Sequence, residues 1–160
     1  MGAAAPVPGK AVLSADITFA LDQFGLPVYE ADDPRYEALG VWLITDVSRS
    51  FLVCLDGLAM VDDVSHGQPP FEEWSSDKFD VTFGSDGVSM RNQWLEYQHG
   101  EYTVTEVREV LERYWGFLVS VPERTHLIRE YRPDLPEWQA ALLRWEERWG
   151  RPHPYRGRLF

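Results

Sequence analysis

The chain has 160 residues, 44% of them hydrophobic, which fits one domain able to bury a real core. Its formal net charge of −11 disfavours binding to nucleic acid or to anionic membranes, and no apolar run is long enough for a signal peptide or a transmembrane helix. The single cysteine, Cys54, excludes an internal disulfide and fits a reducing compartment, so we expect a cytoplasmic location.

The negative charge is distributed unevenly. Residues 1–100 hold 5 Lys or Arg against 16 Asp or Glu, whereas residues 101–160 hold 10 of each. A field of this sign attracts basic partners. The alternative is that the acidity serves solubility alone.

The beginning of the chain predicts a tail and then a short helix. Residues 1–10 are rich in Ala, Pro and Gly, so we expect a flexible tail followed by one globular domain over residues 11–160. Ser14 is placed to cap a helix over residues 15–24, which Gly25 would end. The β-branched pair at residues 17 and 18 leaves a strand open as the alternative.

Residues 41–64 are the main strand prediction. They contain three apolar runs, over residues 41–47, 51–55 and 58–61, and Asp56-Gly57 separates the last two. Asp-Gly at a two-residue gap is a strong hairpin signal. We therefore expect an antiparallel meander with Cys54 buried.

Residues 65–77 are a polar connection in which Phe71 and Trp74 are expected to hold the loop to the body of the protein. Residues 79–83 alternate between apolar and polar side chains, and residues 88–91 return after a glycine-containing turn. A second hairpin over residues 79–92 follows.

The last third of the chain has helical periodicity. Thr103 and Glu106 form a capping-box pattern before an apolar stripe that extends to Leu118. A short helix is expected over residues 124–131 and a final helix over residues 134–149. The remaining residues are a basic extension able to fold back on the acidic half. Together the patterns predict an α+β fold, with an antiparallel sheet of about five strands (meander 41–64 plus hairpin 79–92) covered by C-terminal helices.

No metal, cofactor or catalytic motif emerges from the residue spacing. The four histidines are His66, His99, His126 and His153, and no pair has the spacing of a helical zinc motif. Cys54 lies between apolar neighbours, where an inert core thiol is expected. Adjacent carboxylates on a strand, such as Asp62 and Asp63, point to opposite faces and so do not share one site.

Aromatic side chains interleaved with acidic residues are the feature that indicates a function. Large aromatic anchors beside carboxylates are typical of interfaces for basic proteins. The segment from residue 94 to residue 97 also combines Trp and Tyr with acid. The predicted binding residues are Asp62, Asp63, Glu72, Glu73, Trp74, Asp77 and Asp80. The alternative is that these aromatics close the core under loops.

The leading hypothesis is a small cytoplasmic protein that neutralises or regulates a basic protein partner. In size, charge and lack of a catalytic motif, the chain resembles the acidic immunity proteins and antitoxins that bacteria keep against nuclease-like toxins. A second hypothesis is an enzyme or ligand-binding domain with a site assembled from Arg91, Glu96 and His99. A third is a structural subunit held by the Trp-rich helices.

Overall fold

The computed structural model describes residues 16–124 and 126–160, so the prediction for residues 1–10 lies outside the described part of the chain. The α+β class is confirmed, but the described residues form two small antiparallel sheets instead of one five-stranded sheet. The elements in chain order are β1 (Ile17–Leu21), β2 (Pro27–Ala31), the 3-10 turn η1 (Pro34–Tyr36), α2 (Glu37–Trp42), the π-helical turn η2 (Leu43–Val47), α3 (Phe51–Ser65), β3 (Phe79–Gly84), β4 (Gly87–Asn92), β5 (His99–Tyr102), α4 (Val104–Ser120) and α5 (Glu137–Trp149).

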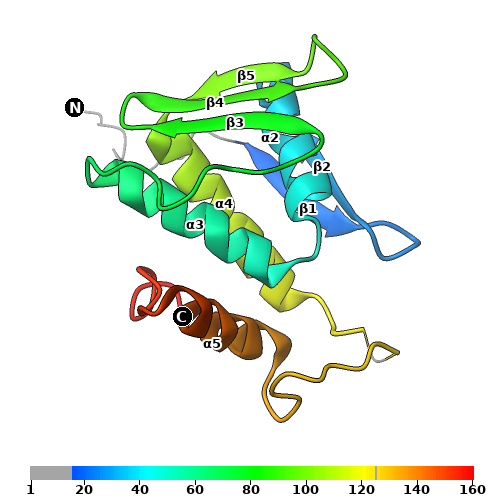
Figure 1. The fold of residues 1–160 in the computed structure, drawn as a ribbon. Coiled ribbons are helices and arrows are strands. Elements are labelled where there is room, and N and C mark those ends of the chain that lie inside the picture. The colour runs from blue at the N-terminus through cyan, green and yellow to red at the C-terminus, as the bar shows by residue number, and fades with distance from the viewer. Residues whose placement is uncertain (1–15, 125) are drawn as a thin grey trace, which may run out of the picture.

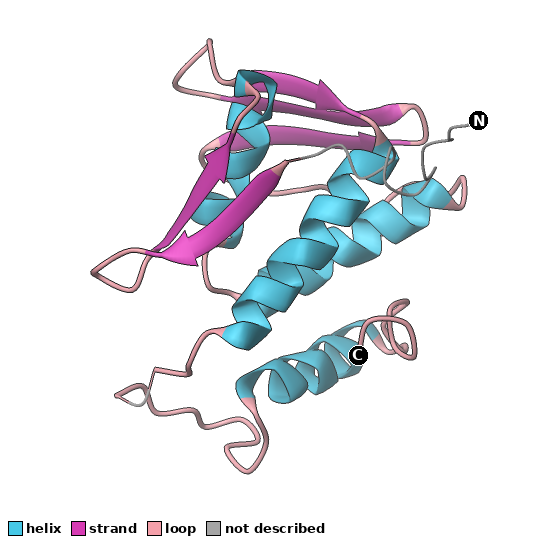
Figure 2. Cartoon of the chain, turned by 180° about the vertical axis from the view of Figure 1, so that it is seen from behind, coloured by secondary structure: helices cyan, strands magenta, loops and turns pink. Residues whose placement is uncertain are grey.

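The elements are arranged in layers (Figure 1). The three-stranded sheet β3-β4-β5 lies on one side of α3 and α4, and α5 packs against α3 on the other side. The β1-β2 hairpin lies beside these layers and contacts α4 through β1 and α2 through β2 (Figure 2). Helix α3 therefore contacts a sheet strand and two helices, and the core forms around it.

The helix predicted over residues 15–24 is wrong, because residues 17–21 form strand β1. Ile17 is fully buried and the following residues alternate in exposure, as in a strand covered on one face. The Asp22 carboxylate accepts hydrogen bonds from the backbone N–H groups of Phe24 and Leu26 at 2.8 and 3.0 Å, which closes the turn into β2. Gly25, with φ of 77°, occupies the left-handed conformation in that turn.

The meander predicted over residues 41–64 is also wrong, because this segment is helical. It contains the end of α2, the turn η2 and the 15-residue helix α3. Ser50 caps α3 by accepting a hydrogen bond from the N–H of Val53 at 3.1 Å. Asp56-Gly57 lies inside the helix, where the absent side chain of Gly57 leaves room for Leu111 of α4. The burial of Cys54 is confirmed.

The hairpin over residues 79–92 is confirmed. β3 and β4 pair in antiparallel register, with Phe79 opposite Asn92 and Phe83 opposite Val88. Phe79, Phe83, Val88 and Met90 are buried, whereas Asp80 faces solvent. Strand β5, which was not predicted, adds a third strand on the far edge of β4.

Helix α4 begins at the predicted capping box. The Thr103 hydroxyl accepts from the N–H of Glu106 at 3.0 Å, and the Glu106 carboxylate accepts from the N–H of Thr103 at 2.9 Å. Its apolar stripe, which includes Trp115, is buried mainly against α3, and not against the sheet as predicted.

The helix predicted over residues 124–131 is wrong, since the described residues there form a loop between α4 and α5. Its aliphatic side chains are open to solvent, with Leu127 49% and Ile128 94% exposed. Without a packed face, a short segment between two prolines does not recover the cost of forming a helix. The final helix begins at Glu137 instead of Asp134 and ends as predicted at Gly150, which has φ of 67°.

A candidate acidic and aromatic interface

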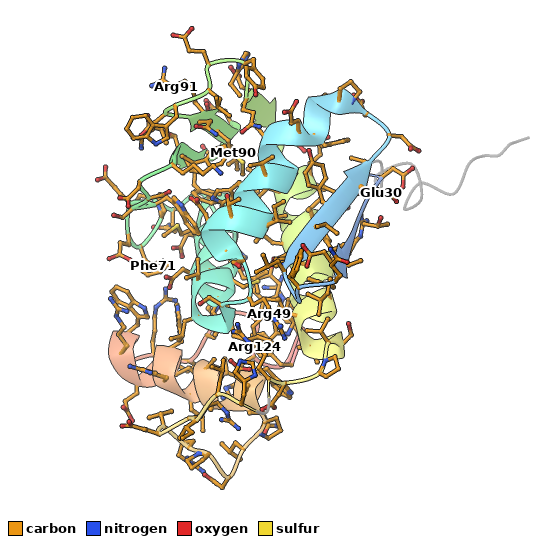
Figure 3. The ribbon with its side chains drawn as sticks, turned by 90° about the vertical axis from the view of Figure 1, so that its right-hand side faces the viewer. Glu30, Arg49, Phe71, Met90, Arg91 and Arg124 are labelled. Atoms are coloured by element: carbon orange, nitrogen blue, oxygen red, sulfur yellow. The ribbon has the colours of Figure 1, made fainter. Side chains whose placement is uncertain are left out.

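The loop between α3 and β3 carries most of the predicted binding residues. It is held to the body of the protein by two aromatic side chains, as expected. The Phe71 ring packs 4.8 Å from the ring of Trp149, and the Trp74 ring packs 4.9 Å from that of Trp42. The Trp74 indole also donates a hydrogen bond to the Asp46 carboxylate at 3.0 Å. The loop is therefore anchored at two points, and its carboxylates are displayed from a fixed backbone (Figure 3 labels Phe71).

Asp62 and Asp63 are engaged within the fold at the end of α3. The Asp62 carboxylate accepts a hydrogen bond from the Arg158 guanidinium at 2.9 Å, so the basic extension folds back on the acidic half as anticipated. The Asp63 carboxylate accepts from the N–H of Phe71 at 2.9 Å, and burial raises the pKa of this group. Asp62 and Asp63 both lie on helix α3, so the prediction that they point to opposite faces of a strand is wrong.

Glu72 and Glu73 are both exposed but lie near different groups. Glu72 is close enough to Asp56 to act on its ionisation: burial raises the pKa of Asp56 to about 6, with Glu72 adding to the effect and the hydrogen bond from Trp145 opposing it. Glu73 lines a hollow together with residues of β3 and β4.

This hollow has a volume of about 510 Å³ and brings together three of the predicted residues, Glu73, Trp74 and Asp80. Its remaining lining residues are Pro70, Val81, Thr82, Phe83 and Arg91. Asp80 is partly compensated there, since its carboxylate lies 3.3 Å from the Arg91 guanidinium and accepts from the Gln93 amide at 3.2 Å. Trp74 also lines a neighbouring hollow of about 340 Å³ that includes Asp77. Glu73, Trp74, Asp77 and Asp80 therefore line two neighbouring hollows that share Trp74, a surface to which Arg91 and Lys78 also contribute.

The turn between β4 and β5 adds exposed aromatic side chains to this surface. Trp94 is 76% exposed and Tyr97 is 68% exposed. The Trp94 indole donates a hydrogen bond to the backbone carbonyl of Asp77 at 3.0 Å, which joins the turn to the acidic loop. We call Glu73, Asp77, Asp80, Trp94 and Tyr97 the acidic-aromatic face.

A buried polar pair shapes this turn. The Asn92 side-chain amide donates to the side-chain Oε1 of Gln98 at 2.8 Å, and both residues are buried. The Asn92 Oδ1 accepts from the N–H groups of Trp94 and Leu95 at 2.8 and 3.2 Å. Asn92 and Gln98 were not among the predicted residues, although an Asn that opens a short polar segment is a recognised turn signal.

The alternative site near His99 is only partly assembled. Arg91 and His99 are paired neighbours on β4 and β5. The His99 ring is exposed, and its Nδ1 contacts the backbone oxygen of Glu96 at 2.9 Å, not the Glu96 carboxylate. Such an arrangement is that of a histidine closing a turn.

Two other titratable groups, Cys54 and His153, are buried and have a structural role. Burial raises the pKa of the Cys54 thiol far above its usual range, with Asp56 adding to the effect, which agrees with an inert thiol. His153 is buried, with Nε2 2.9 Å from the carbonyl of Leu55 and Nδ1 accepting from the N–H of Tyr155 at 3.1 Å. Burial lowers its pKa to about 4, so the ring is neutral near pH 7.

An ion pair joins η1 to the start of α4. The Arg35 guanidinium donates to both carboxylate oxygens of Glu106 at 2.7 and 2.8 Å, and the Tyr36 hydroxyl donates to the same group at 2.7 Å. Burial acts to raise the pKa of Glu106, but the hydrogen bonds from Arg35, Thr103 and Tyr36 outweigh it and lower this pKa to about 2. Each oxygen is satisfied, as expected of a structural group.

Comparisons with known proteins give no relative: no family model, curated protein or solved structure matches this chain. Over residues 16–124 and 126–160, no group of three or more His, Cys, Asp or Glu side chains is placed to hold a metal ion. None of the helices in the described part of the chain has the length and apolarity needed to cross a membrane.

Proposed function

We propose that this protein binds a basic protein partner through the acidic-aromatic face and thereby neutralises or regulates it in the cytoplasm. In kind it would act as the acidic immunity proteins and antitoxins do against nuclease-like toxins. The observation that carries the proposal is the hydrogen bond from Trp94 to Asp77, which fixes a largely exposed indole beside a group of carboxylates.

Two of the three carboxylates on this face, Glu73 and Asp77, are free to act at a distance, whereas Asp80 is partly compensated by Arg91. Glu73 and Asp77 are exposed, and neither forms an ion pair within the described part of the chain. Uncompensated surface carboxylates steer a cationic partner during diffusion and so raise the association rate. Glu72, which is exposed in the same loop, contributes to the same field.

The aromatic side chains would supply the contact itself. Trp and Tyr bury a large area at low cost in side-chain entropy, and they are enriched among the residues that dominate binding energy. Trp94 and Tyr97 have this character, whereas Trp74, placed in the predicted site, is partly buried and packs on Trp42. The carboxylates would thus steer a partner that has a cationic cleft. The turn between β4 and β5 would then hold this partner and occlude its cleft.

A capture experiment with matched charge variants tests this proposal. The tagged protein, the variant E73K/D77K and the control E30K/E147K are used to capture partners from a lysate of the native host at low and at high salt. Both variants change the net charge equally, and Glu30 and Glu147 are exposed residues outside the acidic-aromatic face. We expect a basic protein bound by the wild type and the control, weakened at high salt, and lost from E73K/D77K. Equal retention by both variants, or no specific protein at either salt, would overturn the proposal.

A further inference from the structure

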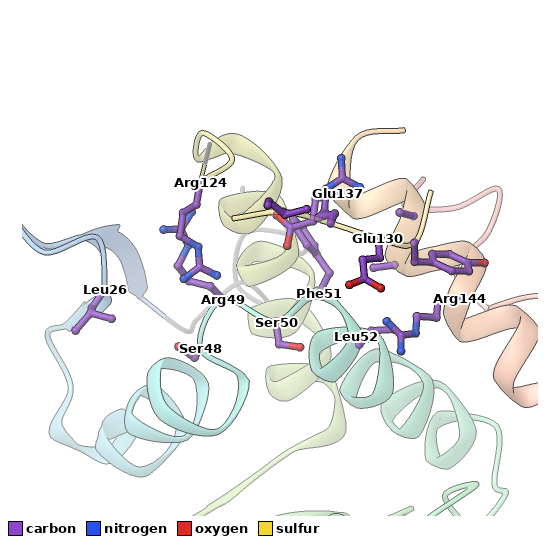
Figure 4. A pocket seen from close by; sticks show the side chains of 15 residues that line it. Leu26, Ser48, Arg49, Ser50, Phe51, Leu52, Arg124, Glu130, Glu137 and Arg144 are labelled. Carbon is purple, nitrogen blue, oxygen red and sulfur yellow. The ribbon is translucent and has the colours of Figure 1, made fainter. Parts of the chain in front are cut away.

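Another hollow, at the other end of the molecule from Arg91, is lined mainly by positive charges, in contrast to the acidic-aromatic face. It has a volume of about 550 Å³ and lies between the N-terminal end of α3, the loop between α4 and α5, and α5 itself (Figure 4). Volumes of this order are typical of small-molecule sites. Four arginines line it, Arg49, Arg124, Arg129 and Arg144, against two carboxylates, Glu130 and Glu137. A cationic hollow is unexpected in a protein with a net charge of −11.

Most of these guanidinium charges have no carboxylate partner among the residues that the structure describes. Arg49 donates to the backbone carbonyls of Gly25 and Pro122 at 3.2 and 3.1 Å, contacts that position the group without neutralising it. Neither Arg124 nor Arg144 forms an ion pair with a described carboxylate, and only Arg129 does, with Glu123 at 3.5 Å.

Arg49 and Arg124 lie side by side in two views (Figures 3 and 4). Two neighbouring guanidinium groups repel each other unless an anion lies between them. The first turn of α3, with Ser50, Phe51 and Leu52 in the lining, adds the partial positive charge of a helix N-terminus to the same space.

The remaining lining residues could contact the organic part of a ligand that is larger than a simple anion. Ala140, Ala141 and Leu52 provide apolar surface, and Tyr131 an aromatic ring. Glu130 and Glu137 offer acceptors for hydroxyl or amino groups. We propose that this hollow binds a phosphate ester with a hydroxyl-bearing body, whose phosphate lies between Arg49 and Arg124. Arginine is the side chain best suited to bidentate recognition of phosphate. The proposal is independent of the acidic-aromatic face.

The test is a titration of the isotope-labelled protein with AMP, adenosine and inorganic phosphate, followed by NMR and calorimetry. The informative variant is Arg124→Ala, because the Arg124 side chain is exposed and forms no ion pair with the described residues, so its truncation should leave the fold intact. Arg91→Ala, an exposed arginine at the other end of the molecule, is the control (Figure 3). An unchanged melting temperature of each variant verifies folding.

We expect saturable shifts of the Ser50, Phe51 and Leu52 amides with AMP and weaker binding of inorganic phosphate. Arg124→Ala should weaken the affinity for AMP about tenfold, and Arg91→Ala should leave this affinity unchanged. No saturable shift with AMP up to about 10 mM, or equal losses in both variants, would overturn the site. Equal affinities for AMP and inorganic phosphate would overturn the assignment of a phosphate ester, as would binding of adenosine equal to that of AMP.

Discussion

The guanidinium of Arg158 contacts the carboxylate of Asp62 at 2.9 Å across 96 positions of sequence. Together with Arg156, whose guanidinium donates to both carboxylate oxygens of Glu146 at 2.7 Å, it attaches the basic end of the chain to α3 and α5. The extension is thus part of the fold, and two of its positive charges form ion pairs within the molecule. Asp62 is correspondingly committed to this pair and largely buried, whereas the proposed interface rests on the exposed Glu73 and Asp77 and on Asp80, whose contact with Arg91 is itself exposed to solvent.

Trp74 and Trp94 should separate stability from binding. Trp74→Ala removes a ring packed on Trp42 and a hydrogen bond to Asp46, and should cost about 2–4 kcal/mol of unfolding free energy. Trp94→Ala removes an exposed ring with one hydrogen bond, and should cost less than about 1 kcal/mol while speeding dissociation of the partner. Chemical denaturation and surface plasmon resonance measure the two effects. A large stability loss in Trp94→Ala would assign this ring to the fold.

Glu106→Gln should lower the unfolding free energy at pH 7 by about 1–3 kcal/mol, because the charge-assisted bonds from Arg35 weaken while a Gln still suits the capping box. The folded pKa of Glu106, about 2, lies below the ordinary value of 4.5. The contribution is therefore present above pH 4.5 and is lost as the pH falls toward 2. Urea unfolding of both proteins across this range measures it. A difference between them that stays constant down to pH 2 would contradict the assignment.

His153 should make the fold sensitive to mild acid. Its pKa is lowered from 6.5 to about 4 in the folded protein, so the unfolded chain binds the proton first. This contribution to stability is complete above pH 6.5 and is lost as the pH falls toward 4. His153→Gln, whose amide can still donate to Leu55, should flatten the pH dependence in that window. The ring proton resonances of His153 should not titrate near pH 6.5, and titration there would show that the ring is accessible.

Asp56→Asn should stabilise the protein at pH 8 by about 1–3 kcal/mol. Burial raises the folded pKa of Asp56 to about 6 from 3.8, so the stabilising protonated form is present below pH 3.8 and is lost as the pH rises through 6. Asn keeps the acceptor for Trp145, which Asp56 contacts at 2.9 Å, and removes the buried charge. Thermal unfolding at pH 8 and at pH 4 should show the gain only at the higher value. A loss at pH 8 would mean that the charge itself is needed.

Gly57→Val should lower the unfolding free energy by about 2–4 kcal/mol. A Cβ at this position would lie 3.3 Å from a Leu111 methyl group and 3.7 Å from the Trp42 ring, so a branched side chain would separate α3 from α4. The matched control is Gly116→Ala in α4, where a Cβ meets nothing within 4 Å. That change should stabilise the protein by about 0.5–1 kcal/mol through helix propensity. Similar stability of the two variants would rule out a close helix crossing at Gly57.

The local signals in the sequence were sufficient for two features whose partners are near in the chain, although they failed for the equally local β1-β2 hairpin. The capping box of Thr103 and Glu106 defined the start of α4, and the alternation after Phe79 defined the hairpin of β3 and β4. These features depend on contacts within a few residues or across one turn, which the order of residues specifies directly. The acidic character of the first part of the chain follows from composition in the same way.

The tertiary structure alone decided the state of residues 41–65. A helix buried on nearly every side has no polar face, so its sequence shows no helical period and its apolar runs are indistinguishable from buried strands. Burial between β3, α4 and α5 makes it a helix, and the close approach of Leu111 makes Gly57 suitable inside it. The hydrogen bond of Trp94 to Asp77 and the shared hollow of Arg49 and Arg124 likewise bring together residues distant in sequence, because chain packing, not local preference, decides which such side chains meet.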